Sequence, residues 1–381
     1  MLYDFEYIEY DRNRNQRSSN TNTNDDFYLV TTSDVYSSFN FLSPLSLIPH
    51  NHPLKQITTH NGITNDTRDY ILKHGIPSNL NQLRPLLWNA LLNVYPSSNT
   101  STWQDTIHRN KDSYLLLKSK YLPYPAHDDK ELLHQINVDL PRTKANLPFF
   151  LSKPKTNTKE THYDVLKRLL YIYAKEHEEL SYVQGMNEII ATFYYVFYNY
   201  VNIKFIALVE SDTYYAFGAL MDEVRPIFTF DNVTQSQIVV YKKVELLKKC
   251  LKVVYKDVYD VLTEKGVLID VYVFRWVVLL FTQDLNMSDC VMLWDRLFAR
   301  ECDRLDFMCY VCCALLGMNK EWLEGNEMEK VFDLVREIKR SRKGFRVSEV
   351  VSKALEVEEK MKRYECEKGN NNSNKERGED V

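Results

Sequence analysis

The feature that most constrains the fold is the helical spacing of apolar residues along most of the chain. Apolar side chains recur at intervals of three and four residues, which places them on one face of an α-helix. These stripes are Leu166, Leu169, Leu170 and Tyr173; Val244, Leu247, Leu251, Val254, Val258 and Val261; Val273, Trp276, Val277, Leu280 and Phe281; Val291, Trp294, Leu297 and Phe298; Phe307, Tyr310, Val311, Ala314 and Leu315; and Val331, Phe332, Val335 and Ile338. Alternating strand patterns are rare, so the sequence predicts an all-α fold.

Some of these segments carry sharper expectations. The stripe from Val244 to Val261 predicts one helix, with Gly266 as its C-terminal cap. Ser288 is a candidate N-cap for the helix that contains Trp294. Residues 188–200 are apolar almost all round, which is typical of a buried central helix.

Composition sets the domain organisation. Only 10 of the 381 residues are glycine, which argues against a turn-rich all-β architecture. Residues 1–65 and 361–381 are polar and rich in asparagine, so we expect a largely flexible N-terminal segment and a disordered tail. Between them we expect a single large helical domain over residues 66–360, with a less regular insert around residues 97–130.

Charge and hydropathy exclude several classes of protein. The net charge of −4 gives no global sign of a nucleic-acid partner. The most basic segment, residues 336–346, is interpreted as a solvated helix end, with contact to an acidic partner or membrane surface as the alternative.

Residues 267–281 come nearest to a membrane span but contain Asp270 and Arg275. The polar N-terminus lacks the pattern of a signal peptide. The seven cysteines are then interpreted as free thiols in the cytoplasm.

The stretch INVDLPRT (136–143) contains an arginine whose purpose is not evident. Pro141 favours an extended conformation at Leu140, so Arg142 is expected in a loop or at a junction between a loop and a helix. There Asp139 is able to cap backbone amides. Taken alone, the stretch indicates a local ion pair between Asp139 and Arg142, an interaction of little energetic value on a protein surface.

Two further stretches contain unusual polar residues. In LSYVQGMNEI (180–189), Gln184 precedes Gly185, whose flexible backbone would let the amide face a ligand; a satisfied polar turn is the alternative. In the stretch 75–92, Arg84 and Trp88 lie four residues apart on one predicted helix, where mutual packing is the default interpretation.

Together these stretches resemble the TBC domain, the family of GTPase-activating proteins for Rab GTPases. The family carries an R-x-x-x-W motif, an I-x-x-D-x-x-R motif and a Y-x-Q motif in that order, and all three are intact here. They are Arg84 and Trp88; Ile136, Asp139 and Arg142; and Tyr182 and Gln184. Residues 274–298 also resemble the RW and WD helices of the family, so the resemblance covers roughly residues 70–320.

The resemblance implies a role for each motif. Arg142 would be an arginine finger that enters the active site of a Rab GTPase, and Gln184 would orient the attacking water in place of the GTPase's own glutamine. Asp139 would orient the segment of Arg142, while Arg84, Trp88 and Tyr182 would brace the site. The chain would need no cofactor of its own, because GTP and Mg²⁺ arrive with the GTPase.

The same resemblance implies a setting and leaves alternatives. The expected partner is a GTP-bound Rab in vesicle trafficking and intracellular protein transport, and membrane contact would be indirect, through the lipidated Rab. One alternative is a Rab-binding protein that does not accelerate hydrolysis. Another is a metal or thiol enzyme built on CYVCC (309–313), although these cysteines lie on an apolar helical stripe, which favours a place in the core.

Overall fold

A computed structural model describes residues 40–124, 129–155, 160–228, 233–326, 334 and 346–376. The chain divides into two compact units, Met1–Asn40 and Phe41–Val381, and every element named below belongs to the second. The described residues form helices and contain no β-strand, which confirms the all-α prediction.

The described elements are mostly α-helices, joined in places by short 3₁₀ turns. The α-helices are α2 (Gln56–Thr59), α3 (Asn65–His74), α4 (Arg84–Leu91), α5 (Trp103–Tyr121), α6 (Lys130–Asp139), α7 (His162–Glu176), α8 (Met186–Tyr200), α9 (Val209–Phe228), α10 (Val233–Val254), α11 (Lys256–Glu264), α12 (Ile269–Tyr272), α13 (Met287–Ala299), α14 (Arg304–Met318), α15 (Lys320–Gly325) and α18 (Val347–Glu376). The 3₁₀ turns are η1 (Ser43–Leu47), η2 (Pro53–Lys55), η3 (Ser78–Leu83), η4 (Thr100–Thr102), η5 (Leu140–Arg142), η6 (Pro148–Leu151) and η7 (Ile203–Leu208), and η8 (Val273–Val278) is a π-helix.

The predicted helix from Val244 to Val261 is two helices. Helix α10 ends at Val254, and Tyr255, with φ −136° and ψ 60°, separates it from α11. Periodicity did not reveal this break because the apolar spacing continues across it. Gly266 has φ 67° just beyond α11, in agreement with its predicted place after a helix.

The stripe around Trp276 is less regular than predicted. Residues Val273–Val278 form the π-helix η8, and Leu280 and Phe281 have φ values of 50° and 60°. The cap of α13 also differs from the prediction, because Asn286, and not Ser288, accepts a hydrogen bond from the backbone N–H of Asp289. The stripe residues Val331, Phe332, Val335 and Ile338 lie outside the described residues, and Leu334 between them is buried.

Helical structure extends beyond the predicted boundaries. Among the described residues it begins at Ser43, upstream of residue 66, and α18 continues past residue 360 to Glu376. The sequence predicted an irregular insert around residues 97–130, whereas Trp103–Tyr121 form the regular helix α5, with Ile107 and Tyr114 buried. Many polar residues on its exposed face hide this short apolar stripe. Residues 1–39 and 377–381 lie outside the described residues.

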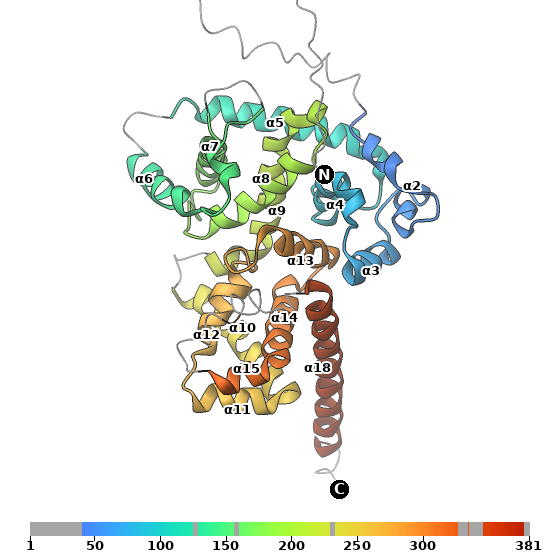
Figure 1. The fold of residues 1–381 in the computed structure, drawn as a ribbon, viewed down its shortest axis with the longest axis vertical. Helices are drawn as coiled ribbons and strands as arrows, with labels where there is room; N and C mark the ends of the chain where they lie inside the picture. The colour runs from blue at the N-terminus through green and yellow to red at the C-terminus, as the bar shows by residue number, and fades with distance from the viewer. Residues whose placement is uncertain are drawn as a thin grey trace, which may run out of the picture. The chain divides into compact units, whose positions relative to one another are not determined.

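An aromatic cluster holds α4, α8 and α13 together. The rings of Trp88, Phe193, Trp294 and Phe298 are fully buried, and the centroids of Trp88 and Phe298 lie 5.1 Å apart in an edge-to-face arrangement. Helix α13 contacts α3, α4 and α8, and it also contacts α14 and α18 (Figure 1). Residues 188–200, predicted as a buried central helix, belong to α8, which is buried up to Phe197 except at Tyr195 and contributes Phe193 and Phe197 to this cluster.

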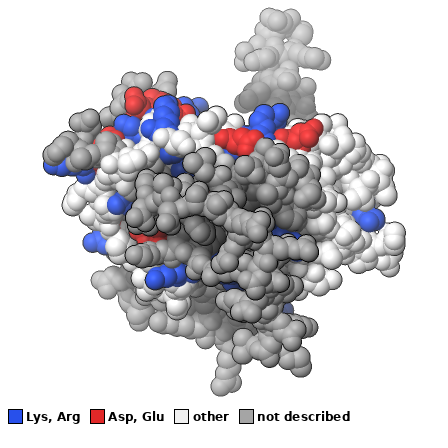
Figure 2. Space-filling model, turned by 90° about the horizontal axis from the view of Figure 1, so that it is seen from above, with Lys and Arg blue, Asp and Glu red and all other residues white. Residues whose placement is uncertain are grey.

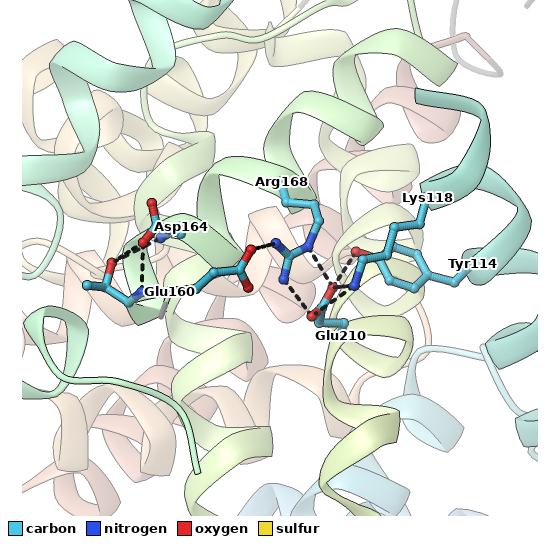
Figure 3. Close-up of polar contacts among 7 residues, drawn as sticks. Tyr114, Lys118, Glu160, Asp164, Arg168 and Glu210 are labelled. Carbon is cyan, nitrogen blue, oxygen red and sulfur yellow. Dashed lines mark hydrogen bonds and ion pairs between the residues drawn. The ribbon is translucent and has the colours of Figure 1, made fainter. Parts of the chain in front are cut away.

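A cluster of charged side chains joins α5, α7 and α9 (Figure 3). The Arg168 guanidinium donates to both carboxylate oxygens of Glu210, at 3.1 and 2.8 Å, and to Glu160 at 2.9 Å. The Tyr114 hydroxyl donates to Glu210 at 3.0 Å, and Lys118 Nζ lies 3.3 Å from it. Burial would raise the pKa of Glu210, but the Arg168 guanidinium, together with Lys118 and the Tyr114 hydroxyl, lowers the pKa to about 2.

Replacing Glu210 by glutamine is expected to lower the free energy of unfolding by about 2 kcal/mol at pH 7, because the largely buried Arg168 then keeps only the more exposed Glu160 as a charged partner. The folded-state pKa of about 2 lies below the ordinary value of 4.5, so ionised Glu210 stabilises the fold above about pH 4.5. That stabilisation is lost as the pH falls from 4.5 towards 2. Urea unfolding of both proteins at pH 7 and pH 4 should give a smaller difference at pH 4; an equal difference would mean that the carboxylate charge is unimportant.

Charges of both signs lie on the surface. On the face seen in Figure 2, lysine and arginine side chains lie beside aspartate and glutamate side chains along one edge, and much of the remaining described surface is uncharged. Of the basic segment 336–346, the structure describes only Arg346, which is exposed and directly precedes α18. Among the described helices, none combines the length and the apolar content that a membrane-spanning segment requires.

Candidate functional site

The segment of Arg142 is a helix end followed by a tight turn. Asp139 is the last residue of α6, and Leu140–Arg142 form η5. The backbone carbonyl of Asp139 accepts hydrogen bonds from the amide and hydroxyl of Thr143, at 3.1 and 3.0 Å. Leu140 has φ −55° and ψ −45°, so the predicted extended conformation before Pro141 was wrong. The proline instead occupies the first turn of η5, where its missing N–H costs no hydrogen bond.

Asp139 does not have the partners predicted from the isolated stretch. Its carboxylate caps no backbone amide of η5 and accepts a hydrogen bond of 2.7 Å from the Tyr182 hydroxyl. Burial, and to a smaller extent this hydrogen bond, raises the pKa of Tyr182. The hydroxyl therefore stays protonated and able to donate. No ion pair joins Asp139 to Arg142 among the described contacts, so the predicted local pair was wrong.

The segment of Gln184 lies beside the segment of Arg142. Besides the contact between Tyr182 and Asp139, the Asn187 side-chain amide donates to the Thr143 hydroxyl at 2.7 Å. Gly185, the residue before α8, has φ 107°, and a Cβ there would lie 2.7 Å from the Leu279 side chain. Two motifs that are 42 residues apart in the sequence are thereby joined by two hydrogen bonds between side chains.

Arg142 and Gln184 themselves are exposed. Neither side chain makes a hydrogen bond or an ion pair within the described part of the chain. Their neighbours are buried or bonded, since Tyr182 is 7% exposed and Thr143 is fully buried. The arrangement leaves one guanidinium and one carboxamide at the surface on two segments that are fixed to each other.

A cleft of about 360 Å³ adjoins Arg142. Its lining includes Lys144, Glu188, Thr282, Gln283 and Leu285, so a third segment, between η8 and α13, contributes to it.

Four of the seven described non-glycine residues with positive φ lie in the segments around this site, and the other three, Asn61, Asn93 and Asp303, are of types that tolerate this conformation. The non-glycine residues Lys144, Ser181, Leu280 and Phe281 have positive φ values of 48°, 55°, 50° and 60°. Each such conformation carries a cost that the surrounding contacts must offset, and such residues cluster at functional sites. Because the four strained residues belong to three separate segments that adjoin one another, they favour this region as the functional site.

Arg84 and Trp88 lie in the core and not at this surface. Arg84 is 3% exposed and donates to both carboxylate oxygens of Asp295 on α13, from Nε at 3.0 Å and from Nη2 at 2.8 Å. Trp88 Nε1 donates to the same carboxylate at 2.9 Å, and so does the backbone amide of Ile76 at 3.1 Å. Arg84 and Trp88 therefore meet through a shared acceptor, and not mainly by packing on each other.

The remaining site residue predicted from the motifs is Ile136, which is fully buried in α6. Sequence reasoning missed Asp295, although the WD pair in residues 274–298 was a signal for it. It also missed Thr143, Asn187, Lys144 and Glu188, which directly flank the motifs. Their contacts connect distant segments, so the sequence carries no spacing signal for them.

The cysteines of CYVCC lie in the core. Cys309, Cys312 and Cys313 are buried in α14, and burial raises the pKa of all three thiols. Within the described ranges, no group of three or more histidine, cysteine, aspartate or glutamate side chains is arranged to hold a metal ion. The described positions of these cysteines thus favour packing over reactivity.

The profile of the Rab-GTPase-TBC domain family matches residues 81–323, more than half of the chain. The chain belongs to the TBC domain family of Rab GTPase-activating proteins. All three motifs and Asp295 lie within the matched residues. The exposed side chains of Arg142 and Gln184, on two adjoining segments, both lie within the matched region.

Individual relatives share part of the chain. Human TBC1 domain family member 13 is 37% identical over 164 residues, which are 43% of this chain and 40% of that protein. The GTPase-activating protein gyp1 of Schizosaccharomyces pombe is 27% identical over 283 residues, 70% of this chain and 52% of the relative. The chain thus matches about half or less of the length of these relatives.

A solved structure shares the TBC fold. The crystal structure of the Ypt/Rab-GAP domain of Gyp1p aligns with a TM-score of 0.67 and 19% identity, covering 86% of this chain and 100% of that domain. At this identity the similarity establishes the fold alone.

Proposed function

We propose that this TBC domain accelerates GTP hydrolysis by a Rab-family GTPase in trans, with Arg142 as an arginine finger and Gln184 as a glutamine finger. The observation that carries the proposal is the hydrogen bond of 2.7 Å between Tyr182 and Asp139, which joins the two segments while leaving both proposed fingers exposed. A side chain that enters the active site of another protein needs a backbone that is held in place and a functional group without intramolecular partners.

The chemistry of each finger follows from its functional group. Hydrolysis of GTP spreads negative charge over the γ-phosphate and the leaving oxygen, and a planar guanidinium stabilises that charge through several hydrogen bonds. A carboxamide has a donor and an acceptor, so Gln184 is suited to orient the attacking water. The GTPase supplies GTP and Mg²⁺, so this chain acts as an activator and does not carry out the reaction alone.

The setting follows from the partner. The proposed partner is a lipidated Rab in the GTP form, whose membrane would bring this chain to the cytoplasmic surface of an organelle in vesicle trafficking. The second candidate function is Rab binding without acceleration of hydrolysis. The exposure of both Arg142 and Gln184 without internal partners favours the activator, since a pure binding surface does not require these two side chains.

A panel of GTP-loaded Rab GTPases tests the proposal. Phosphate release is measured for each GTPase with and without the chain. We expect at least one Rab to hydrolyse GTP faster with catalytic amounts of the chain. Binding to a GTP-loaded Rab without faster phosphate release would support the second candidate function.

Replacing Gln184 by alanine is expected to lower the stimulated rate roughly 10²-fold, which is typical for loss of one hydrogen-bonding group at a transition state. Gln135→Ala removes an exposed glutamine from α6 and serves as the matched control, with an unchanged rate. Phosphate release from the responsive Rab is the measurement. Full activity of Gln184→Ala would remove the glutamine finger from the mechanism.

A further inference from the structure

Lys144 is a buried lysine two residues after Arg142. Its backbone φ of 48° is unusual for a non-glycine residue, and the residue is 8% exposed. The Nζ atom lies 3.2 Å from the Glu188 carboxylate and donates a hydrogen bond to the backbone carbonyl of Thr282. None of the three family motifs includes Lys144, and the proposed mechanism does not use it.

The contacts of Lys144 connect three segments. Lys144 belongs to the segment of Arg142, Glu188 lies in the first turn of α8 four residues after Gln184, and Thr282 lies between η8 and α13. Lys144, Glu188 and Thr282 also line the cleft beside Arg142. A single ammonium group thus joins the segments of both proposed fingers to a third segment that lines the same cleft.

Because Lys144 and Glu188 are both buried, each charge depends on the other as its partner. The side chains of Lys144 and Glu188 are 7% and 8% exposed, and a buried charge without a partner is strongly unfavourable. The two charges must therefore stay together whenever the segments are in place. The left-handed backbone at Lys144 needs this kind of support, because isolated chains rarely adopt it.

We propose that Lys144 is a positioning residue for the stimulated hydrolysis of GTP. It holds the segment of Arg142 against α8 and against the segment of Thr282, so that Arg142 and Gln184 reach the nucleotide in one geometry. This inference rests on the proposed function. Because both fingers remain present without Lys144, its loss lowers kcat and leaves KM for the GTPase nearly unchanged; a misplacement of about 1 Å can cost roughly 10²-fold in rate.

The test compares Lys144→Met with Lys144→Arg, using the GTP-loaded Rab that responds to the wild-type chain. Lys144→Met keeps the length of the side chain without its charge, and we expect kcat to fall roughly 10- to 100-fold with KM within about twofold. Lys144→Arg keeps a charged donor and should recover most of kcat. Lys360→Met, on the exposed face of α18, is the matched control with unchanged kinetics.

A double variant separates positioning from stability. Lys144→Met leaves a buried Glu188 carboxylate unpaired and should lower the melting temperature. Lys144→Met with Glu188→Gln removes that charge, so the melting temperature should recover while kcat stays low. Recovery of kcat together with the melting temperature would overturn the proposal, because the defect would then be one of stability.

The contacts of Lys144 with Glu188 and with the carbonyl of Thr282 form a clamp between the three segments. Hydrogen exchange of the chain alone tests this clamp without any GTPase. We expect the amides of residues 143–147 and 282–285 to exchange faster in Lys144→Met and at the wild-type rate in Lys144→Arg. If no Rab responds to the wild-type chain, the proposed function fails and exchange still tests the clamp. If a Rab responds, and Lys144→Met changes neither exchange nor kcat, the positioning role is wrong and the proposed function stands.

Discussion

Replacing Arg142 by alanine is expected to lower the stimulated hydrolysis of GTP by roughly 10³–10⁵-fold, the effect of an arginine finger in other GTPase systems. The same substitution should change the free energy of unfolding by less than about 0.5 kcal/mol, because the side chain is exposed and has no partner in the described part of the chain. Phosphate release and thermal unfolding measure the two effects.

Two variants sharpen this experiment. Arg142→Lys keeps the positive charge but not the planar fork of donors, so it should restore only a small part of the rate. Arg363→Ala removes an exposed arginine from α18, where it pairs with Glu359, and should leave the rate unchanged. A large loss of stability in Arg142→Ala would contradict the finger and indicate a structural arginine.

Replacing Asp295 by alanine is expected to lower the free energy of unfolding by about 3–5 kcal/mol, because it leaves the buried Arg84 guanidinium without its counter-charge. Trp88 Nε1 and the Ile76 amide lose their acceptor as well. Urea unfolding measures the difference.

A milder variant covers the case in which Asp295→Ala does not fold. Asp295→Asn keeps one carbonyl acceptor without the charge and should show an intermediate loss. Asp222→Ala, which removes an exposed aspartate paired with Arg225, is the control with little change. Wild-type stability in Asp295→Asn would show that the charge of this carboxylate does not hold α4 to α13.

The helical periodicity of the sequence predicted which segments form helices more accurately than it predicted where each helix begins and ends. The apolar stripes correctly predicted α7, α13 and α14, because each helix must bury a continuous face. The break at Tyr255 and the π-helix η8 were not predictable, since both preserve the apolar spacing while changing the backbone. The cap at Asn286 was missed because Ser288 is an equally suitable residue on local grounds.

The isolated stretches gave misleading local interpretations. Asp139 and Arg142 suggested a surface ion pair, whereas Asp139 accepts a hydrogen bond from Tyr182 and Arg142 is exposed. Arg84 and Trp88 suggested packing on one another, whereas both donate to Asp295. In each case the true partner is remote in the sequence, and local spacing carries no information about it.

The sequence by itself determined the all-α class, the order of the three motifs and the family, because helical periodicity and short motifs are properties of neighbouring residues. Only the tertiary structure decided that the segments of Arg142 and Gln184 lie side by side, that Asp295 gathers Arg84 and Trp88, and that Lys144 bridges three segments. The physical reason is that these contacts depend on how the helices pack, and packing brings together residues that no local pattern relates.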